Sequence, residues 1–247
     1  MRETLENEFI KVEIEHFGAE LKSVYNKIDN TELLWQGDLL WWGKTSPILF
    51  PRIGYEENEL TKQYSVPKHG FARDNTFIVL RRTPDELVFL LSETDIKSIS
   101  FKLPFKLYVT YSLSKSTLNI SYEVDAYFDF MIGGHPAFNL SKEDNSLHFN
   151  NDEFFKLKAQ KIDFNTIHHK AKPNLDITDE TFIDDALVFK NESKENSVKL
   201  NDSLILKHYS QYLGLWSPPC APFVCIEPWN VSSHNSKNLS YSIMVIC

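Results

Sequence analysis

The sequence predicts an all-β fold, a large antiparallel β-sandwich, and two observations support this. Apolar and polar residues alternate with a period of two in several segments, which is typical of strands with one buried face. No segment shows a long apolar repeat with the period of a helix. Many short strands without intervening helices imply antiparallel sheets that pack as a sandwich or close as a barrel, and we expect the sandwich.

The expected strands follow one another along the chain. Alternating or apolar runs predict them at residues 10–15, 76–80, 86–91, 105–113, 117–124, 203–207, 222–226 and 241–245. The polar stretches 141–153, 165–180 and 191–202 are expected to be long loops, either solvated insertions or walls of a binding site. Because no linker divides the chain, residues 1–247 are expected to form a single domain.

Composition restricts the possible partners. A net charge of −8 and a pI near 5.5 oppose nucleic-acid binding, which needs clustered Lys and Arg. No stretch approaches the roughly 20 apolar residues of a membrane helix, and the acidic N-terminus lacks the apolar region of a signal peptide. We therefore expect a cytoplasmic protein without nucleic-acid or membrane partners. Cys220, Cys225 and Cys247 are expected to be reduced, mostly buried thiols.

Common cofactor and hydrolase motifs are missing from the sequence. The stretch 37–45 resembles a phosphate-binding loop, but five residues separate Gly37 from Gly43 where that motif has four. There is no G-x-S-x-G elbow, H-E-x-x-H helix or dinucleotide-binding glycine pattern. No cofactor is therefore predicted.

Four short stretches combine polar residues with an apolar or glycine-containing context: "FPRIG" at 50–54, "KHGFARD" at 68–74, "GGHPAFN" at 133–139 and "CIEPW" at 225–229. His135 and Glu227 each precede a proline, which restricts their backbones. An apolar run precedes Glu227, so a central strand would desolvate its carboxylate and raise its pKa toward the range of a general base. Histidine titrates near neutral pH. Such a pair can donate one proton and accept another without a cofactor.

Each residue also has an ordinary structural interpretation. The imidazole of His135 could bind a backbone carbonyl, and Glu227 could pair with Arg52 or Arg73. The combination of four such stretches favours a catalytic site over these separate structural roles.

The four stretches resemble the aldose 1-epimerase (galactose mutarotase) family, and nearly the whole chain is similar to its bacterial LacX-type branch. "GGHPAFNL" at 133–140 matches the family's His-x-x-Phe-Asn-Leu stretch, and "IEPW" at 226–229 matches its late strand. The resemblance implies an antiparallel β-supersandwich, with His135 as general acid and Glu227 as general base. It also implies a place in carbohydrate metabolism.

The resemblance further assigns sugar-binding residues: Arg52, His69 as a second active-site histidine, and Asp185, for which Asp184 is an alternative. The implied reaction is the interconversion of the α and β anomers of an aldohexose through the open-chain aldehyde. Trp229 or Phe71 could cover an apolar face of the sugar, although a core role is expected for both.

Three alternatives remain open. The stretch 68–74 also resembles hexose-6-phosphate mutarotases of the same fold, in which case Lys68 and Arg73 would hold the phosphate. A second alternative is a non-catalytic sugar-binding domain. The third is a zinc enzyme that uses His69, His135 and Glu227, but the histidines show no tight ligand spacing, and no metal is predicted. The sequence does not predict the oligomeric state.

Overall fold

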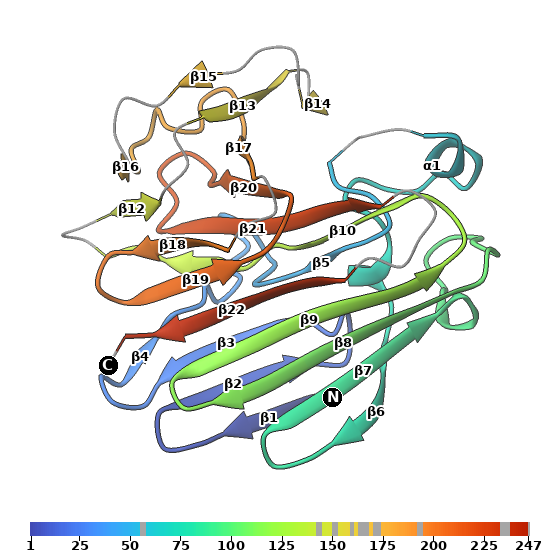
Figure 1. The fold of residues 1–247 in the computed structure, drawn as a ribbon, viewed down its shortest axis with the longest axis horizontal. Coiled ribbons are helices and arrows are strands. Elements are labelled where there is room, and N and C mark those ends of the chain that lie inside the picture. The colour runs from blue at the N-terminus through green and yellow to red at the C-terminus, as the bar shows by residue number, and fades with distance from the viewer. Residues whose placement is uncertain are drawn as a thin grey trace.

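The computed structural model describes residues 1–54, 58–141, 145–149, 153–158, 161–162, 168–169, 174–191, 195–232 and 238–246. The strands of this part form three sheets, and neighbouring strands within each sheet pair in antiparallel fashion (Figure 1). The fold class predicted from the sequence is confirmed.

The smallest sheet is N-terminal. It contains, in spatial order, β1 (Arg2–Glu6), β2 (Ile10–Glu15), β3 (Leu21–Asn26) and β4 (Thr31–Glu32). The expected strand at 10–15 is therefore present. Its alternating residues Ile10, Val12 and Ile14 are fully buried, because they face the core while the polar residues between them face outward.

The second sheet contains the candidate site. Its spatial order is β14 (Lys161–Ile162), β13 (Glu153–Lys158), β17 (Leu187–Lys190), β20 (Tyr212–Trp216), β21 (Phe223–Ser232), β10 (Phe130–Gly134) and β5 (Ile48–Leu49). In addition, β11 (Ala137–Asn139) pairs with β21, and β15 (His168–His169) pairs with β13. The strand β21 is thus flanked on both edges.

The third sheet crosses the front of the molecule in Figure 1. Its order is β16 (Asn174–Asp176), β12 (Ser146–Phe149), β18 (Asn196–Leu200), β19 (Leu204–His208), β22 (Leu239–Val245), β9 (Thr117–Ala126), β8 (Phe105–Ser114), β7 (Glu86–Ser92) and β6 (Ile78–Arg82). The described helices are α1 (Glu59–Gln63) and the 3₁₀ turns η1 (Ala72–Asp74) and η2 (Glu93–Asp95). None of the three could cross a membrane.

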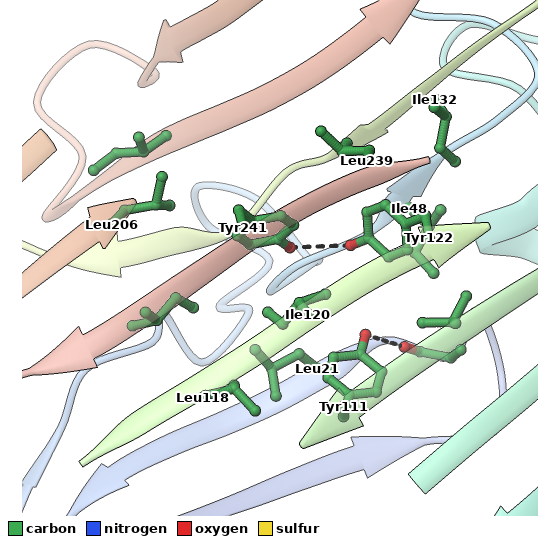
Figure 2. Packing of buried hydrophobic residues seen from close by; sticks show 14 of the residues in the cluster. Leu21, Ile48, Tyr111, Leu118, Ile120, Tyr122, Ile132, Leu206, Leu239 and Tyr241 are labelled. Carbon is green, nitrogen blue, oxygen red and sulfur yellow. Dashed lines mark hydrogen bonds between the residues drawn. The ribbon is translucent and has the colours of Figure 1, made fainter. Parts of the chain in front are cut away.

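A hydrophobic cluster built from all three sheets fills the interior. Figure 2 shows part of it, with three buried tyrosine hydroxyls that form hydrogen bonds inside the apolar packing. The hydroxyls of Tyr122 and Tyr241 lie 3.0 Å apart, and that of Tyr111 donates to the carbonyl of Ala19 at 2.7 Å. These bonds remove the cost of burying phenolic groups. The three rings themselves belong to the main hydrophobic cluster.

The prediction of long loops at 141–153, 165–180 and 191–202 is wrong in part. Each stretch contains a strand: β12 lies in the first, β16 in the second and β18 in the third. These strands are short and lie toward one end of the third sheet. Their side chains alternate over too few positions to give a clear signal, so pairing with the neighbouring strands decides their conformation. The other parts of these three stretches lie largely outside the described residues.

The cysteines differ from the expectation in one respect. Cys225 is a buried free thiol, but Cys220 is a free thiol that is exposed. Cys220 has a φ of 60° in the turn after Pro218 and Pro219, where the chain lies at the surface. Cys247 lies outside the described residues.

Candidate active site

The backbone around His135 is fixed by hydrogen bonds from three directions. The amide of Ile226 on β21 donates to the carbonyl of Pro136 at 3.1 Å, and the amide of Ala137 donates to the carbonyl of Thr45 at 2.9 Å. The amide of Trp35 donates to the carbonyl of Ala137 at 2.9 Å. Pro136 has no amide proton to donate, so these bonds satisfy the backbone hydrogen-bonding groups of the short segment between β10 and β11. They hold His135 against β21.

Glu227 lies in the middle of β21, opposite Gly214 of β20. A Cβ on Gly214 would lie 3.3 Å from the Cβ of Glu227 and 3.2 Å from the indole nitrogen of Trp229, so glycine leaves room for both side chains. The result is direct contact between the two predicted catalytic groups: the Nε2 of His135 lies 3.2 Å from the Oε1 of Glu227. Both side chains are buried.

A cavity of about 230 Å³ opens onto this pair. Five of the six residues predicted from the sequence line it: His69, Arg73, His135, Asp185 and Glu227. Lys68 lines it as well. The cavity is smaller than the roughly 300–1,000 Å³ of pockets for drug-sized ligands, a size that suits a single small polar molecule.

Burial changes the proton affinities of the pair in opposite directions. Burial lowers the pKa of His135 to about 3, and the charge of Arg73 adds to this effect. Burial also raises the pKa of Glu227 to about 8, as predicted from the apolar run before it, against the opposing charge of Lys68. Between these two values the coupled pair holds one proton, which either residue can carry.

His69 presents a defined tautomer to the cavity. Its Nδ1 accepts a hydrogen bond from the amide of Gly54 at 3.2 Å, so in the neutral ring the proton is on Nε2. Burial and the nearby cationic groups lower its pKa to about 2, which keeps the ring neutral. The rings of His69 and His135 meet edge to face, with centroids 5.6 Å apart. His69 is therefore a hydrogen-bond donor beside His135.

Two non-glycine residues of the cavity wall have left-handed backbone conformations. The φ of His69 is 64°, followed by 76° at Gly70, where a Cβ would lie 1.9 Å from the carbonyl oxygen of Phe50. The φ of Asp185 is 94°, and its carboxylate accepts a hydrogen bond from the amide of Ala186 at 2.9 Å. Asp185 lines the cavity and Asp184 does not, which separates the two aspartates that the sequence left as alternatives.

Arg73 and Arg52 differ in their positions. The guanidinium of Arg73 donates to the carbonyl of Lys68 at 2.9 Å and lines the cavity. The guanidinium of Arg52 is buried, donates to the carbonyl of Val66 at 2.6 Å, and is not part of the cavity wall. Arg52 is therefore not part of the cavity wall itself, although its charge is close enough to contribute to the lowered pKa of His69.

The aromatic residues also divide between core and cavity. Phe71 is fully buried in the main hydrophobic cluster, as expected. Trp229 is buried in a smaller hydrophobic cluster, as expected, but it also lines the cavity, and its indole N–H has no hydrogen-bond partner among the residues that the structure describes. Trp42 and Trp216, which the sequence analysis did not select, line the cavity too. The adjacent tryptophans 41 and 42 in a glycine-flanked loop were the available signal.

The three residues of the zinc alternative are not the set that the structure brings together. Within the described ranges, the one set of potential ligands whose atoms lie within 4.8 Å of one another is His135, Cys225 and Glu227. His69 is not in this set. The direct contact between His135 and Glu227 favours proton exchange between them.

Comparisons with known proteins extend over nearly the whole chain. A model of the aldose 1-epimerase family matches residues 1–237. Protein LacX of Lactococcus lactis subsp. lactis, in its plasmid and chromosomal forms, is 26% identical over 260 residues, covering 92% of this chain and 86% of the relative.

Solved structures agree with this match. The galactose mutarotase related enzyme from Lactobacillus acidophilus superposes with a TM-score of 0.85 at 25% identity, covering 99% of this chain and 97% of that one. A galactose mutarotase-like protein from Lactobacillus casei gives a TM-score of 0.84 at 25% identity, covering 99% and 100%. A putative aldose 1-epimerase from Escherichia coli, 13% identical with a TM-score of 0.72 and coverages of 99% and 98%, shares the fold. The chain therefore belongs to the aldose 1-epimerase family of isomerases, enzymes that act on sugars.

Proposed function

We propose that this protein is a cofactor-independent mutarotase, with a single catalytic domain, that interconverts the α and β anomers of an aldohexose. The proposal rests mainly on the 3.2 Å contact between His135 and Glu227 at the cavity wall. In a cyclic sugar the anomeric oxygen O1 and the ring oxygen O5 are both bonded to C1. Two groups that handle the protons of these oxygens must therefore lie side by side, as these two do.

In the proposed reaction, ionised Glu227 takes the proton of the O1 hydroxyl while protonated His135 donates its proton to O5. The C1–O5 bond breaks with its electron pair on O5, and a C1=O1 double bond forms, so neither a free alkoxide nor an oxocarbenium ion is needed. After rotation about C1–C2, the two proton transfers reverse and the ring closes to the other anomer. The pair holds one proton at the start, in the open-chain state and at the end.

The other polar groups of the cavity are proposed to hold the sugar. The Nε2–H of neutral His69 donates to an oxygen near the reacting ring, and the indole N–H of Trp229 is a second donor beside Glu227. The carboxylate of Asp185 accepts from a sugar hydroxyl. Fixing the other ring carbons leaves C1 free to rotate, which the mechanism requires. In this proposal Arg52 supports the wall from behind through Val66.

A sugar-binding protein without activity would not need an acid and a base in contact, which favours the enzyme. Polarimetry or NMR exchange on a panel of freshly dissolved α-anomers, free and 6-phosphorylated, tests the proposal. Acceleration of at least one anomerisation over the spontaneous rate is expected. Binding of sugars without any acceleration would support the binding protein instead.

A phosphorylated hexose is a second candidate substrate, because two cationic side chains, Lys68 and Arg73, line the cavity. If a 6-phosphate binds there, Arg73→Ala should raise KM for the phosphorylated sugar by about 10-fold or more, since hydrogen bonds to charged groups contribute about 1.5–3 kcal/mol. KM for the free sugar should change much less. Steady-state kinetics on both sugars provide the measurement.

Arg2→Ala is a matched control for charge, because Arg2 is an exposed residue of β1 outside the cavity. Equal effects of Arg73→Ala on both sugars would mean that Arg73 supports the wall through its bond to the Lys68 carbonyl and does not recognise phosphate. Added salt should weaken the binding of the phosphorylated substrate and leave the binding of the free sugar unchanged.

The pH dependence should reflect the shared proton. With the pKa of Glu227 raised to about 8 and that of His135 lowered to about 3, the pair holds one proton at neutral pH. Above about pH 8 that proton is lost and no acid remains, so kcat/KM should fall by up to tenfold per pH unit. A profile of kcat/KM from pH 5 to about 10, corrected for the spontaneous reaction, measures this. A rate that rises through pH 8 would instead assign Glu227 as an independent base.

A further inference from the structure

The loop at residues 37–45, whose glycines resemble those of a phosphate-binding motif, packs beside the candidate active site. Residues 37–45 connect β4 with β5, and the chain turns where the amides of Trp41 and Trp42 both donate to the carbonyl of Asp38 at 3.0 Å. Gly37 has a φ of 75°, and a Cβ there would lie 3.3 Å from the carbonyl oxygen of Gly43. The loop closes tightly and directs Trp42 toward the catalytic pair.

The indole of Trp42 lies against the imidazole of His135 in a tilted arrangement, with ring centroids 4.8 Å apart and planes inclined by 31°. Three contacts hold the indole in place. The carbonyl of Trp42 accepts a hydrogen bond from the indole nitrogen of Trp35 at 2.8 Å. The indole of Trp42 stacks on the ring of Phe223 and meets the indole of Trp216 edge to face, and in each pair the ring centroids lie 6.0 Å apart. Trp42 also lines the cavity.

The groups around His135 differ in how they act on a positive charge. Glu227 on β21 is an anionic partner and its neighbour Cys225 is a buried thiol, and the backbone of His135 itself also acts to raise its pKa. The cationic Lys68 and Arg73 oppose that charge, and His69 is neutral. The Nδ1 of His135 is buried without a hydrogen-bond partner among the residues described. Many catalytic histidines have a carboxylate or carbonyl at that nitrogen, which fixes the ring. Here the tilted indole of Trp42 lies against the imidazole ring.

We propose that Trp42 is a positioning residue for the general acid: its indole holds the His135 ring against Glu227 and stabilises the positive charge of the protonated ring. A cation over the face of tryptophan is attracted by the negative π-system, most strongly when water is excluded. This role rests on the acid function proposed above for His135. It would raise the population of the reactive form, in which His135 carries the proton.

A direct test measures the proton affinity of His135 without relying on turnover. In a Glu227→Gln background the coupling to Glu227 is removed, so an NMR titration of the ring nitrogens reports His135 alone. Adding Trp42→Leu should lower the pKa of His135 by about one unit, and Trp42→Phe should give a smaller decrease. Trp41→Leu is the matched control, because Trp41 lies on the same loop but does not line the cavity.

The sign of the change decides between two roles. If Trp42 only shields His135 from water, its removal admits water and the pKa of His135 rises. A rise, or no change, in the folded Trp42→Leu and Trp42→Phe variants would overturn the proposal. Should Trp42→Leu fail to fold by circular dichroism, the comparison rests on Trp42→Phe, which keeps an aromatic ring with a weaker attraction for cations.

Kinetics of the enzyme with Glu227 intact provide the second measurement. Trp42→Leu should lower kcat by about 3–30-fold, with partial recovery in Trp42→Phe, while Trp41→Leu stays near the wild type. A higher KM with unchanged kcat would make Trp42 a wall for the sugar and overturn the proposal. If the wild type anomerises no sugar, the proposed function fails, but the titration still decides whether Trp42 stabilises the imidazolium.

Discussion

Replacing Glu227 with glutamine should lower kcat for mutarotation by at least about 10²-fold, because the amide cannot accept the proton of the anomeric hydroxyl. Glutamine has nearly the same shape as a protonated glutamate, the form favoured by the raised pKa of Glu227. The fold and the affinity for sugar should therefore be kept. Polarimetry measures the rate, and calorimetric titration measures sugar binding.

The stability of this variant is a further check. In the wild type, the pKa of Glu227 is raised above its value in the unfolded chain, so its contribution to stability is present at low pH and is lost as the pH rises through about 8. Glutamine does not titrate and should remove this part of the pH dependence. Glu123→Gln, at an exposed position of β9, is the control and should change neither rate nor stability. A Glu227→Gln enzyme with most of its activity would remove Glu227 from the mechanism.

Alanine substitutions should distinguish the roles of the two histidines of the cavity, His135 and His69. His135→Ala should reduce kcat by about 10²-fold or more, because it deletes the proton donor. His69→Ala should raise KM and reduce kcat by a smaller factor, since a positioning hydrogen bond contributes about 1–3 kcal/mol when its partner is left unpaired. Steady-state kinetics of both variants, with folding verified by circular dichroism, test this order.

The structure gives a reason for this order. Of the two histidines, His135 is the one in contact with Glu227, whereas the Nδ1 of His69 accepts a hydrogen bond from the amide of Gly54. His69 therefore keeps its single proton on Nε2 and cannot readily gain a second one, given its low pKa. If His69→Ala loses more kcat than His135→Ala while binding sugar normally, the acid role belongs to His69.

The fold was predictable where alternation is long. Residues 105–113 and 117–124 coincide with β8 and β9, because ten-residue strands with one buried face leave a strong period of two. The strands β12 and β18 were missed because they have only four and five residues. Their conformation depends on pairing with a neighbour that a local pattern does not reveal.

The candidate site was predictable where one residue combines reactive chemistry with a local constraint. His135 and Glu227 stood out because each precedes a proline, and both line the cavity. Trp42 and Trp216 were missed, since tryptophans are common in cores and only the approach of the 37–45 loop to β20 and β21 places them beside His135. Arg52 was expected at the cavity wall, but its guanidinium is buried, donates to the carbonyl of Val66 and does not line the cavity.

The left-handed backbones of His69 and Asp185 place stability and activity in competition at the same positions. A residue with a Cβ in this conformation costs about 1–3 kcal/mol, and glycine avoids most of that cost. Selection of this chain for thermostability alone would therefore favour glycine at positions 69 and 185. Each such gain would delete a side chain from the cavity wall. Engineering of a heat-resistant variant should for this reason exclude both positions from the library.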